Sequence, residues 1–401
     1  LLILLMLTGM PISIALGLTV LTFIYTMTSV PTESVALKLF TGIDNFEIMA
    51  IPFFILAGNF LTHGGVARRM INFATSMVGH WYGGLGLAGV MACALFAAIS
   101  GSSPATVIAI GSIMLPAMVK QGFPKRFGAG VVASSGALGI LIPPSIVMVM
   151  YCVATSGMLV EGPNGEKVTA ASVGQMFIAG VVPGALLGLT LGLVTWYRAW
   201  HGDFPCLPRA TWAQRLKAFL DSFWGLALIL IVMGGIYAGV FTPTEAAAMS
   251  AVYAFFISVF VYKDMSLRDV PKVLLASANM SAMLLYIITN AVLFSFLMTA
   301  GTVMEPSSIT LIMAPILFPV AVKLGIDPVH FGILIIVNME IGMITPPVGL
   351  NLYVASGISK LGLTEMSISV LPWLIAMLLF LMLITYVPEV TLWFPRMLGV
   401  L

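Results

Sequence analysis

Two matching pairs of polar, helix-breaking motifs interrupt an otherwise almost continuous apolar sequence. The first pair is residues 101–106 (GSSPAT) and 138–144 (LGILIPP), and the second is residues 304–310 (MEPSSIT) and 341–347 (IGMITPP). An internal repeat that puts helix breakers at matching positions of two apolar halves is typical of the binding site of a transporter. Equivalent positions lie 203 residues apart: Pro116 and Pro319, Lys120 and Lys323, Gly122 and Gly325, Gly139 and Gly342, and the diprolines Pro143-Pro144 and Pro346-Pro347.

The low content of charged residues excludes an ordinary soluble protein. Only 8% of the 401 residues are charged and 60% are hydrophobic, whereas soluble domains carry about 25% charged residues. Several apolar runs exceed the roughly 18 residues that suggest a spanning helix. No basic run indicates nucleic acid as a partner, and the three cysteines lack the spacing of a metal site or a disulfide framework. The sequence therefore predicts an all-α polytopic membrane protein in a lipid bilayer.

The apolar runs divide the chain into two halves. We predict a first repeat over residues 1–200, a cytoplasmic connector at 201–221 and a second repeat over residues 222–401. In the first half, two apolar arms of about 16 residues are short for full spans and indicate a re-entrant hairpin. The hairpin tips are predicted at 101–106 and 304–310, and helices broken by Gly and Pro at 127–156 and 329–357.

Positively charged residues assign the sides of the membrane. Basic clusters at 198–217 and 263–272 are separated by two predicted spans, so both can be cytoplasmic. Counting back places residues 120–126 on the same side, together with an amphipathic interfacial helix at 63–80. The first hairpin then opens to the cytoplasm, and the second is approached from outside. The two repeats are therefore predicted to be inverted, which suits alternating access around a site at mid-membrane.

The breaks carry the candidate binding residues. A broken helix leaves backbone N–H and C=O groups unpaired, which a membrane tolerates only where protein, water or ligand satisfies them. Free carbonyls with nearby hydroxyls suit a small hard cation such as Na⁺, and helix N-termini suit a carboxylate. The predicted substrate-binding residues are Ser102, Ser103, Thr106, Gly136, Asn338 and Asn351. The predicted Na⁺ ligands are Ser103, Gly139, Pro143, Glu305, Ser307, Ser308, Gly342, Thr345 and Pro346.

These residues also have a structural interpretation. A single Ser or Gly in a membrane helix is usually a packing contact. Glu305 and Glu340 lie in apolar surroundings, where a carboxyl group can cap a helix end as well as bind an ion. The histidines form no ligand cluster, and we interpret all four as interfacial polar residues: His63, His80, His201 and His330.

An intramembrane enzyme is the competing class of protein. No histidine or aspartate pair lies in a span where it could activate Ser102 or Ser103 as a nucleophile. No phosphate-binding glycine motif is present, and no covalent cofactor is expected. We therefore predict a transporter driven by an ion gradient.

The motifs together resemble those of a known family. Five runs carry the resemblance: 100–106 (SGSSPAT), 136–145 (GALGILIPPS), 239–245 (GVFTPTE), 324–332 (LGIDPVHFG) and 338–351 (NMEIGMITPPVGLN). They are similar to the large membrane subunit, the DctM type, of tripartite ATP-independent periplasmic (TRAP) transporters, and the first tip is most similar to the C4-dicarboxylate branch.

The resemblance implies an elevator-type ion-transporter fold in the bacterial inner membrane. It also implies Na⁺-driven import of a small organic acid. Two protein partners follow from it, a small membrane subunit of the DctQ type and a periplasmic substrate-binding protein of the DctP type.

The second half departs from this pattern by its length. Pro11 and Pro116 are 105 residues apart, whereas Pro243 and Pro319 are 76 apart, so the second half is 29 residues shorter. The shortening falls near residues 299–303, where an interfacial helix and the first arm of the second hairpin are expected. The alternative function is therefore a shortened membrane subunit that assembles with its partners but does not transport.

Restoring about 30 residues before Gly301 tests the effect of this shortening. We expect the lengthened chain to show stronger Na⁺-dependent uptake, because the second hairpin then has both arms and the second ion site is complete. Uptake into vesicles measures this. Equal Na⁺-dependent uptake with and without the added residues would contradict the hypothesis.

Overall fold

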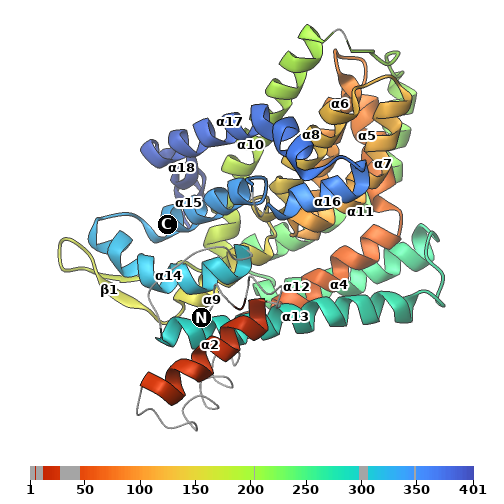
Figure 1. The fold of residues 1–401 in the computed structure, drawn as a ribbon. Coiled ribbons are helices and arrows are strands. Elements are labelled where there is room, and N and C mark those ends of the chain that lie inside the picture. The colour runs from red at the N-terminus through yellow and green to blue at the C-terminus, as the bar shows by residue number, and fades with distance from the viewer. Residues whose placement is uncertain (1–4, 6–11, 28–45, 203, 298–305, 347–348) are drawn as a thin grey trace.

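The computed structural model describes residues 5, 12–27, 46–202, 204–297, 306–346 and 349–401. Most of these residues are helical (Figure 1). The elements are α2 (Ile12–Met27), η1 (Phe46–Met49), α4 (Ala50–His63), α5 (Val66–Val78), α6 (Gly84–Ser100), α7 (Ser103–Lys120), α8 (Lys125–Gly136), η2 (Ala137–Ile140), α9 (Ile146–Thr155), β1 (Leu159–Glu161), β2 (Lys167–Thr169), α10 (Val173–His201), α11 (Trp212–Tyr237), α12 (Pro243–Phe256), η3 (Ile257–Val261), α13 (Val270–Leu297), α14 (Pro306–Lys323), α15 (Pro328–Gly342), α16 (Leu350–Ser359), α17 (Leu363–Tyr386) and α18 (Glu389–Met397).

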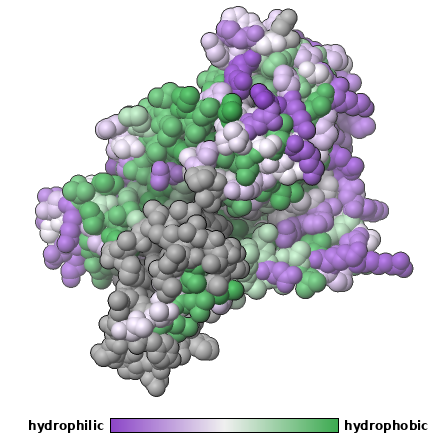
Figure 2. All heavy atoms as spheres, viewed as in Figure 1, coloured by the Kyte–Doolittle hydropathy of each residue, from purple (hydrophilic) through white to green (hydrophobic). Residues whose placement is uncertain are grey.

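Helix length and apolar composition confirm the predicted all-α polytopic membrane protein. Within the described residues, six helical segments are long and apolar enough to cross a membrane: Phe46–His63, Ser103–Lys120, Val173–His201, Trp212–Tyr237, Pro243–Val261 and Leu363–Tyr386. Shorter apolar helices accompany them, as hairpins and broken helices require. Figure 2 shows broad hydrophobic areas on one face of the molecule, with many hydrophilic residues along its right-hand side.

The helices pack in two groups. In the first, α4 lies along α12 and α13, and α2 packs on α13 at the lower side of Figure 1. In the second, α6, α7, α8, α10, α16 and α17 form a bundle. The groups meet where α4 crosses α6, and there a Cβ added to Gly58 would lie 3.4 Å from the backbone of Ser100. Small residues at such crossings let membrane helices approach closely.

Contacts bring the predicted cytoplasmic segments together at one end of the bundle. The backbone N–H of Leu207 donates to the carbonyl of Gly79 at 3.0 Å. The Arg198 guanidinium lies 4.8 Å from the ring centre of Trp373, and Arg126 forms an ion pair with Glu365. The connector after α10, the end of α5 and the starts of α8 and α17 therefore share one end.

The second half contains a turn at Gly325 that is equivalent to the turn at Gly122. The two turns have different neighbours. Gly325, which follows α14, is near the β1–β2 hairpin, since a Cβ added to it would lie 3.5 Å from Pro163. This hairpin lies in the polar connector between α9 and α10. In the first half, by contrast, the ring of Phe123 contacts that of Phe204 in the connector, with 5.4 Å between the ring centres. The two equivalent turns therefore belong to different clusters of loops.

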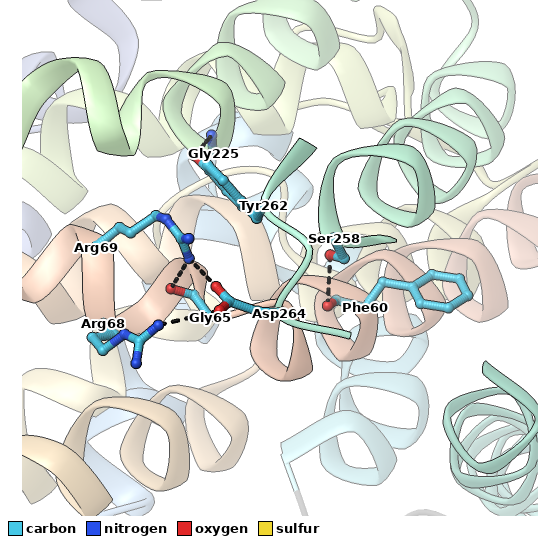
Figure 3. Close-up of polar contacts among 8 residues, drawn as sticks. All are labelled: Phe60, Gly65, Arg68, Arg69, Gly225, Ser258, Tyr262 and Asp264. Carbon is cyan, nitrogen blue, oxygen red and sulfur yellow. Dashed lines mark hydrogen bonds and ion pairs between the residues drawn. The ribbon is translucent and has the colours of Figure 1, made fainter. Parts of the chain in front are cut away.

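An ionic cluster joins the start of α5 to the segment after α12 (Figure 3). The Asp264 carboxylate pairs with both Arg68, at 3.2 Å, and Arg69. Arg69 also donates to the Gly65 carbonyl at 3.1 Å and stacks 3.9 Å from the ring centre of Tyr262. Gly65 has a φ of +69°, which only glycine adopts without strain. The sharp bend between α4 and α5 is thereby tied to the end of α12.

The boundaries differ from the predicted ones in the connector and at the C-terminus. The connector predicted at 201–221 ends earlier, because α11 begins at Trp212. Thr211 and Gln214 form a capping box there, in which each side chain bonds the other residue's backbone N–H. The amphipathic helix α18 was not predicted. The predicted tip at 304–310 lies partly outside the described residues, and α14 begins at Pro306.

Replacing Asp264 with Ala tests the ionic cluster. Arg69 is only 19% exposed, so the loss of its partner should destabilise the protein by about 1–2 kcal/mol and lower the melting temperature by a few degrees. Lys272→Ala is the control, because Lys272 is 84% exposed and its pair with Asp269 is 3.8 Å long. Equal melting temperatures for the two variants in detergent would show that the cluster does not stabilise this bend.

Candidate substrate and ion site

The first hairpin tip is a tight turn between α6 and α7. α6 ends at Ser100, and Gly101 adopts a φ of +59° that reverses the chain. Ser102 is extended, and α7 begins at Ser103 with Pro104 in its first turn, as is common at helix starts. The Thr106 hydroxyl lies 2.9 Å from both the Ser100 hydroxyl and the Ser102 carbonyl. The tip therefore satisfies part of its own backbone.

The first broken helix is interrupted between Gly136 and Ile146, within the predicted segment 127–156. α8 ends at Gly136, a short 3-10 turn follows, and α9 begins at Ile146 after the diproline. The Ser145 hydroxyl donates to the Ile140 carbonyl at 2.6 Å and accepts from the Met148 N–H at 3.4 Å. One hydroxyl thus satisfies a backbone group on each side of the break.

The hairpin tip docks directly on this break. The Ser103 hydroxyl donates to the Gly136 carbonyl at 2.9 Å. A Cβ added to Gly139 would lie 2.6 Å from the Ser102 carbonyl oxygen, and one added to Gly101 would lie 2.8 Å from the Pro144 oxygen. Atoms at these distances would clash, so both close approaches require glycine. The two motifs of the first half therefore form one contact.

Asn351 joins the second half to this contact. It lies in the first turn of α16 and is completely buried. Its side-chain N–H₂ group donates to the Ser103 hydroxyl at 2.7 Å and to the Ala133 carbonyl at 3.3 Å. Its Oδ1 atom is buried and has no hydrogen-bond partner among the described residues. The sequence placed Asn351 beside the second break, but its side chain reaches the first hairpin.

The second break has few neighbours among the described residues, and the predicted tip equivalent to the first lies partly outside them. Gly342 is exposed, and no described atom lies within 4 Å of a Cβ added to it. Thr345 donates to the Ile341 carbonyl at 2.7 Å, the hydrogen bond of an ordinary helix turn. Pro346 and Asn338 are exposed, so the structure does not bring Asn338 into the group around Ser103.

Two other predictions for the second half have different outcomes. Glu305 lies outside the described residues, as do the side chains of Ser307 and Ser308 at the start of α14. Glu340 is completely buried, and neither of its carboxyl oxygens has a hydrogen-bond partner among the described residues.

A cavity of about 350 Å³ lies beside the first tip. Gly101, Ser102 and Ser103 line one side. The opposite side is lined by α4 and α13, through Asn59, Thr62, His63, Met280, Met283 and Leu284. Its volume suits a small organic molecule. The interpretation of His63 as only an interfacial residue is therefore incomplete, because helical spacing alone does not show which neighbour a helix end faces.

The chain is similar in sequence to known membrane transport proteins. The family described as "Tripartite ATP-independent periplasmic transporter, DctM component" matches residues 1–303 and 296–390. The chain is 70% identical to the C4-dicarboxylate TRAP transporter large permease protein DctM of Rhodobacter capsulatus, over 100% of this chain and 98% of that protein. It is 49% identical to the DctM protein of Pseudomonas aeruginosa, over 92% and 90% of the two chains.

A third relative carries more than one component. The isethionate TRAP transporter permease protein DctMQ of Oleidesulfovibrio alaskensis is 40% identical, over 96% of this chain and 64% of that protein. The fold is similar to the crystal structure of the Alcanivorax borkumensis YdaH transporter, with a TM-score of 0.56, 14% identity, and coverage of 90% and 89%.

The alignments also bear on the length of the second half. The R. capsulatus alignment extends over 431 positions, whereas this chain has 401 residues, so at least 30 positions have no counterpart here. The two family matches meet at residues 296–303.

The family match covers almost the whole chain in two segments, and the apolar helices agree with a membrane transport protein. The chain belongs to the DctM family of large membrane components of TRAP transporters, and it is a multi-pass transport protein rather than an enzyme.

Proposed function

We propose that this chain is the permease subunit of a Na⁺-coupled importer of small organic acids, with C4-dicarboxylates as the substrate class. The observation that carries the proposal is the docking of Ser102 and Ser103 on the first break, beside a cavity of about 350 Å³. The names of the R. capsulatus and P. aeruginosa relatives support C4-dicarboxylates. Ser103, Pro104 and Ala105 of the first turn of α7 line this cavity, and the N-terminus of a helix favours a carboxylate.

The oxygens around Ser103 form our candidate for a Na⁺ site. The Ser103 hydroxyl, the Gly136 and Ala133 carbonyls and the Asn351 amide are linked by hydrogen bonds. The Oδ1 atom of Asn351 has no hydrogen-bond partner in its present position. Rotation of the side-chain amide by half a turn would place Oδ1 where the N–H₂ group now lies. Four oxygen atoms would then converge, an arrangement that suits a hard cation at unwound helix segments.

The second predicted ion site, at Gly342, Thr345 and Pro346 with Glu305, Ser307 and Ser308, remains a proposal. It follows from the repeat, and so does the inverted arrangement of the two halves. The different surroundings of Gly122 and Gly325 support the inversion. An elevator-type movement of the bundle against α4, α12 and α13 follows from the family resemblance and from the packing of the helices in two groups.

Two protein partners complete the proposed importer. The family is one component of a tripartite system. We infer a small membrane subunit of the DctQ type, and the fused DctMQ protein of O. alaskensis supports it. A periplasmic substrate-binding protein of the DctP type would deliver the acid. The alternative is a shortened subunit that assembles with these partners without transport, and the missing 30 positions favour it.

Uptake into proteoliposomes separates the two functions. With the small subunit and the binding protein added, we expect an inward Na⁺ gradient to drive accumulation of succinate, malate and fumarate, and not of sialic acid. Collapse of the gradient should abolish accumulation, because no ATPase module supplies energy. A complex that assembles and yet accumulates none of the three acids would support the alternative.

Na⁺-dependent stabilisation tests the site at Ser103. Binding to the folded state stabilises a protein by about 2.7 kcal/mol at a ligand concentration of 100 Kd, so NaCl should raise the melting temperature above that in KCl. We expect Asn351→Leu to reduce this difference. Asn338→Leu is the matched control because Asn338 is exposed on α15. An undiminished Na⁺ effect in Asn351→Leu would argue against these ligands.

A further inference from the structure

His63 lines the cavity from the end of α4. It is the last residue of α4 and lines the cavity with Asn59 and Thr62. Its Nδ1 atom lies 2.9 Å from the Asn59 carbonyl oxygen. A carbonyl oxygen only accepts, so Nδ1 carries the hydrogen. The Nε2 atom is left for a second partner.

The cavity wall is otherwise uncharged. Among the described residues that line it, His63 is the only one with a titratable side chain. The Asn59 amide donates to the Ser277 hydroxyl at 2.8 Å, and the Thr62 hydroxyl donates to the Gly58 carbonyl at 2.7 Å. These groups are already engaged within the protein. A dicarboxylate in this cavity would meet a single side chain able to carry positive charge.

Charged groups lie near the His63 ring. Asp269, just before α13, has a pKa held below its usual range by hydrogen bonds from Ser266, and then by the positive charges of Lys272 and His63. Asp269 thus lies close enough to His63 to interact with its charge. Arg68 and Arg69, near the start of α5, are paired with Asp264. When both nitrogens of the ring carry hydrogen, Nε2 donates and the ring is a cation.

We propose that His63 binds one carboxylate of the transported acid through Nε2–H. This rests on the proposed function and deepens it. The hairpin tip belongs to the bundle of α6, α7 and α8, whereas His63 belongs to the group of α4, α12 and α13. The substrate is therefore held across the boundary between the two groups, with hydroxyls on one side and the cation on the other.

Kinetics of His63→Gln in the assembled transporter test this proposal. We expect the KM for succinate to rise about tenfold, the loss of one charge-assisted hydrogen bond, with kcat little changed. His63→Lys should restore most of the affinity.

His201→Gln is the matched control. His201 also ends a long helix, is exposed, and places Nδ1 3.0 Å from the carbonyl four residues earlier, but it does not line the cavity. We expect its KM to equal that of the parent. Equal KM values for His63→Gln and His201→Gln would overturn the proposal.

A binding measurement keeps this result separate from the proposed function. The Kd of succinate is measured for the purified protein in NaCl, with the parent and both variants. A weaker Kd in His63→Gln alone supports the role of His63 even if the parent transports nothing, in which case only the proposed function fails. Succinate binding that is equal in all three proteins overturns the role of His63.

Discussion

The need to satisfy backbone hydrogen bonds inside a membrane governs this structure. Every interruption of a helix at membrane depth requires a local partner for the exposed N–H and C=O groups. At the first break the Ser145 and Ser103 hydroxyls supply these partners, at 2.6 Å from Ile140 and 2.9 Å from Gly136. The contact forms only because Gly139 lets the hairpin tip approach. The same requirement that makes the break costly thereby fixes the polar groups of the site in place.

The cavity follows from how the two helix groups are held. Its polar side is fixed by the tip and the first break, and its other side by α4 and α13. The bend after α4 is tied by Asp264 to the segment after α12. The ionic cluster therefore adds to the apolar packing of α4 on α12, in which the rings of Phe60 and Phe255 are in contact. A site between two separately stabilised groups can change its width without unfolding either one.

The sequence predicted the helices well and the contacts between them only in part. Apolar runs and Gly–Pro breaks located α6 to α9, because lipid leaves the backbone few alternatives to a helix. The capping box at Thr211 and Gln214 was a readable signal for the start of α11. The place of Asn351 at the first tip, the exposure of Asn338 and the position of His63 depend on how helices rotate against distant neighbours. A linear pattern does not contain that information.

Gly139 and Gly342 are equivalent in the repeat, but their described surroundings differ. Gly139 is required because the hairpin tip lies 2.6 Å from where its Cβ would be, whereas the equivalent Gly342 has no described neighbour within 4 Å. At Gly139 the close neighbour is the Ser102 carbonyl oxygen of the hairpin tip. At least 30 positions of the R. capsulatus relative have no counterpart here, and the family matches meet at 296–303, just before the second tip. The second tip lies partly outside the described residues, so its shortening stays a prediction from the sequence, and the first half is the one in which the structure shows a hairpin tip in contact with its break.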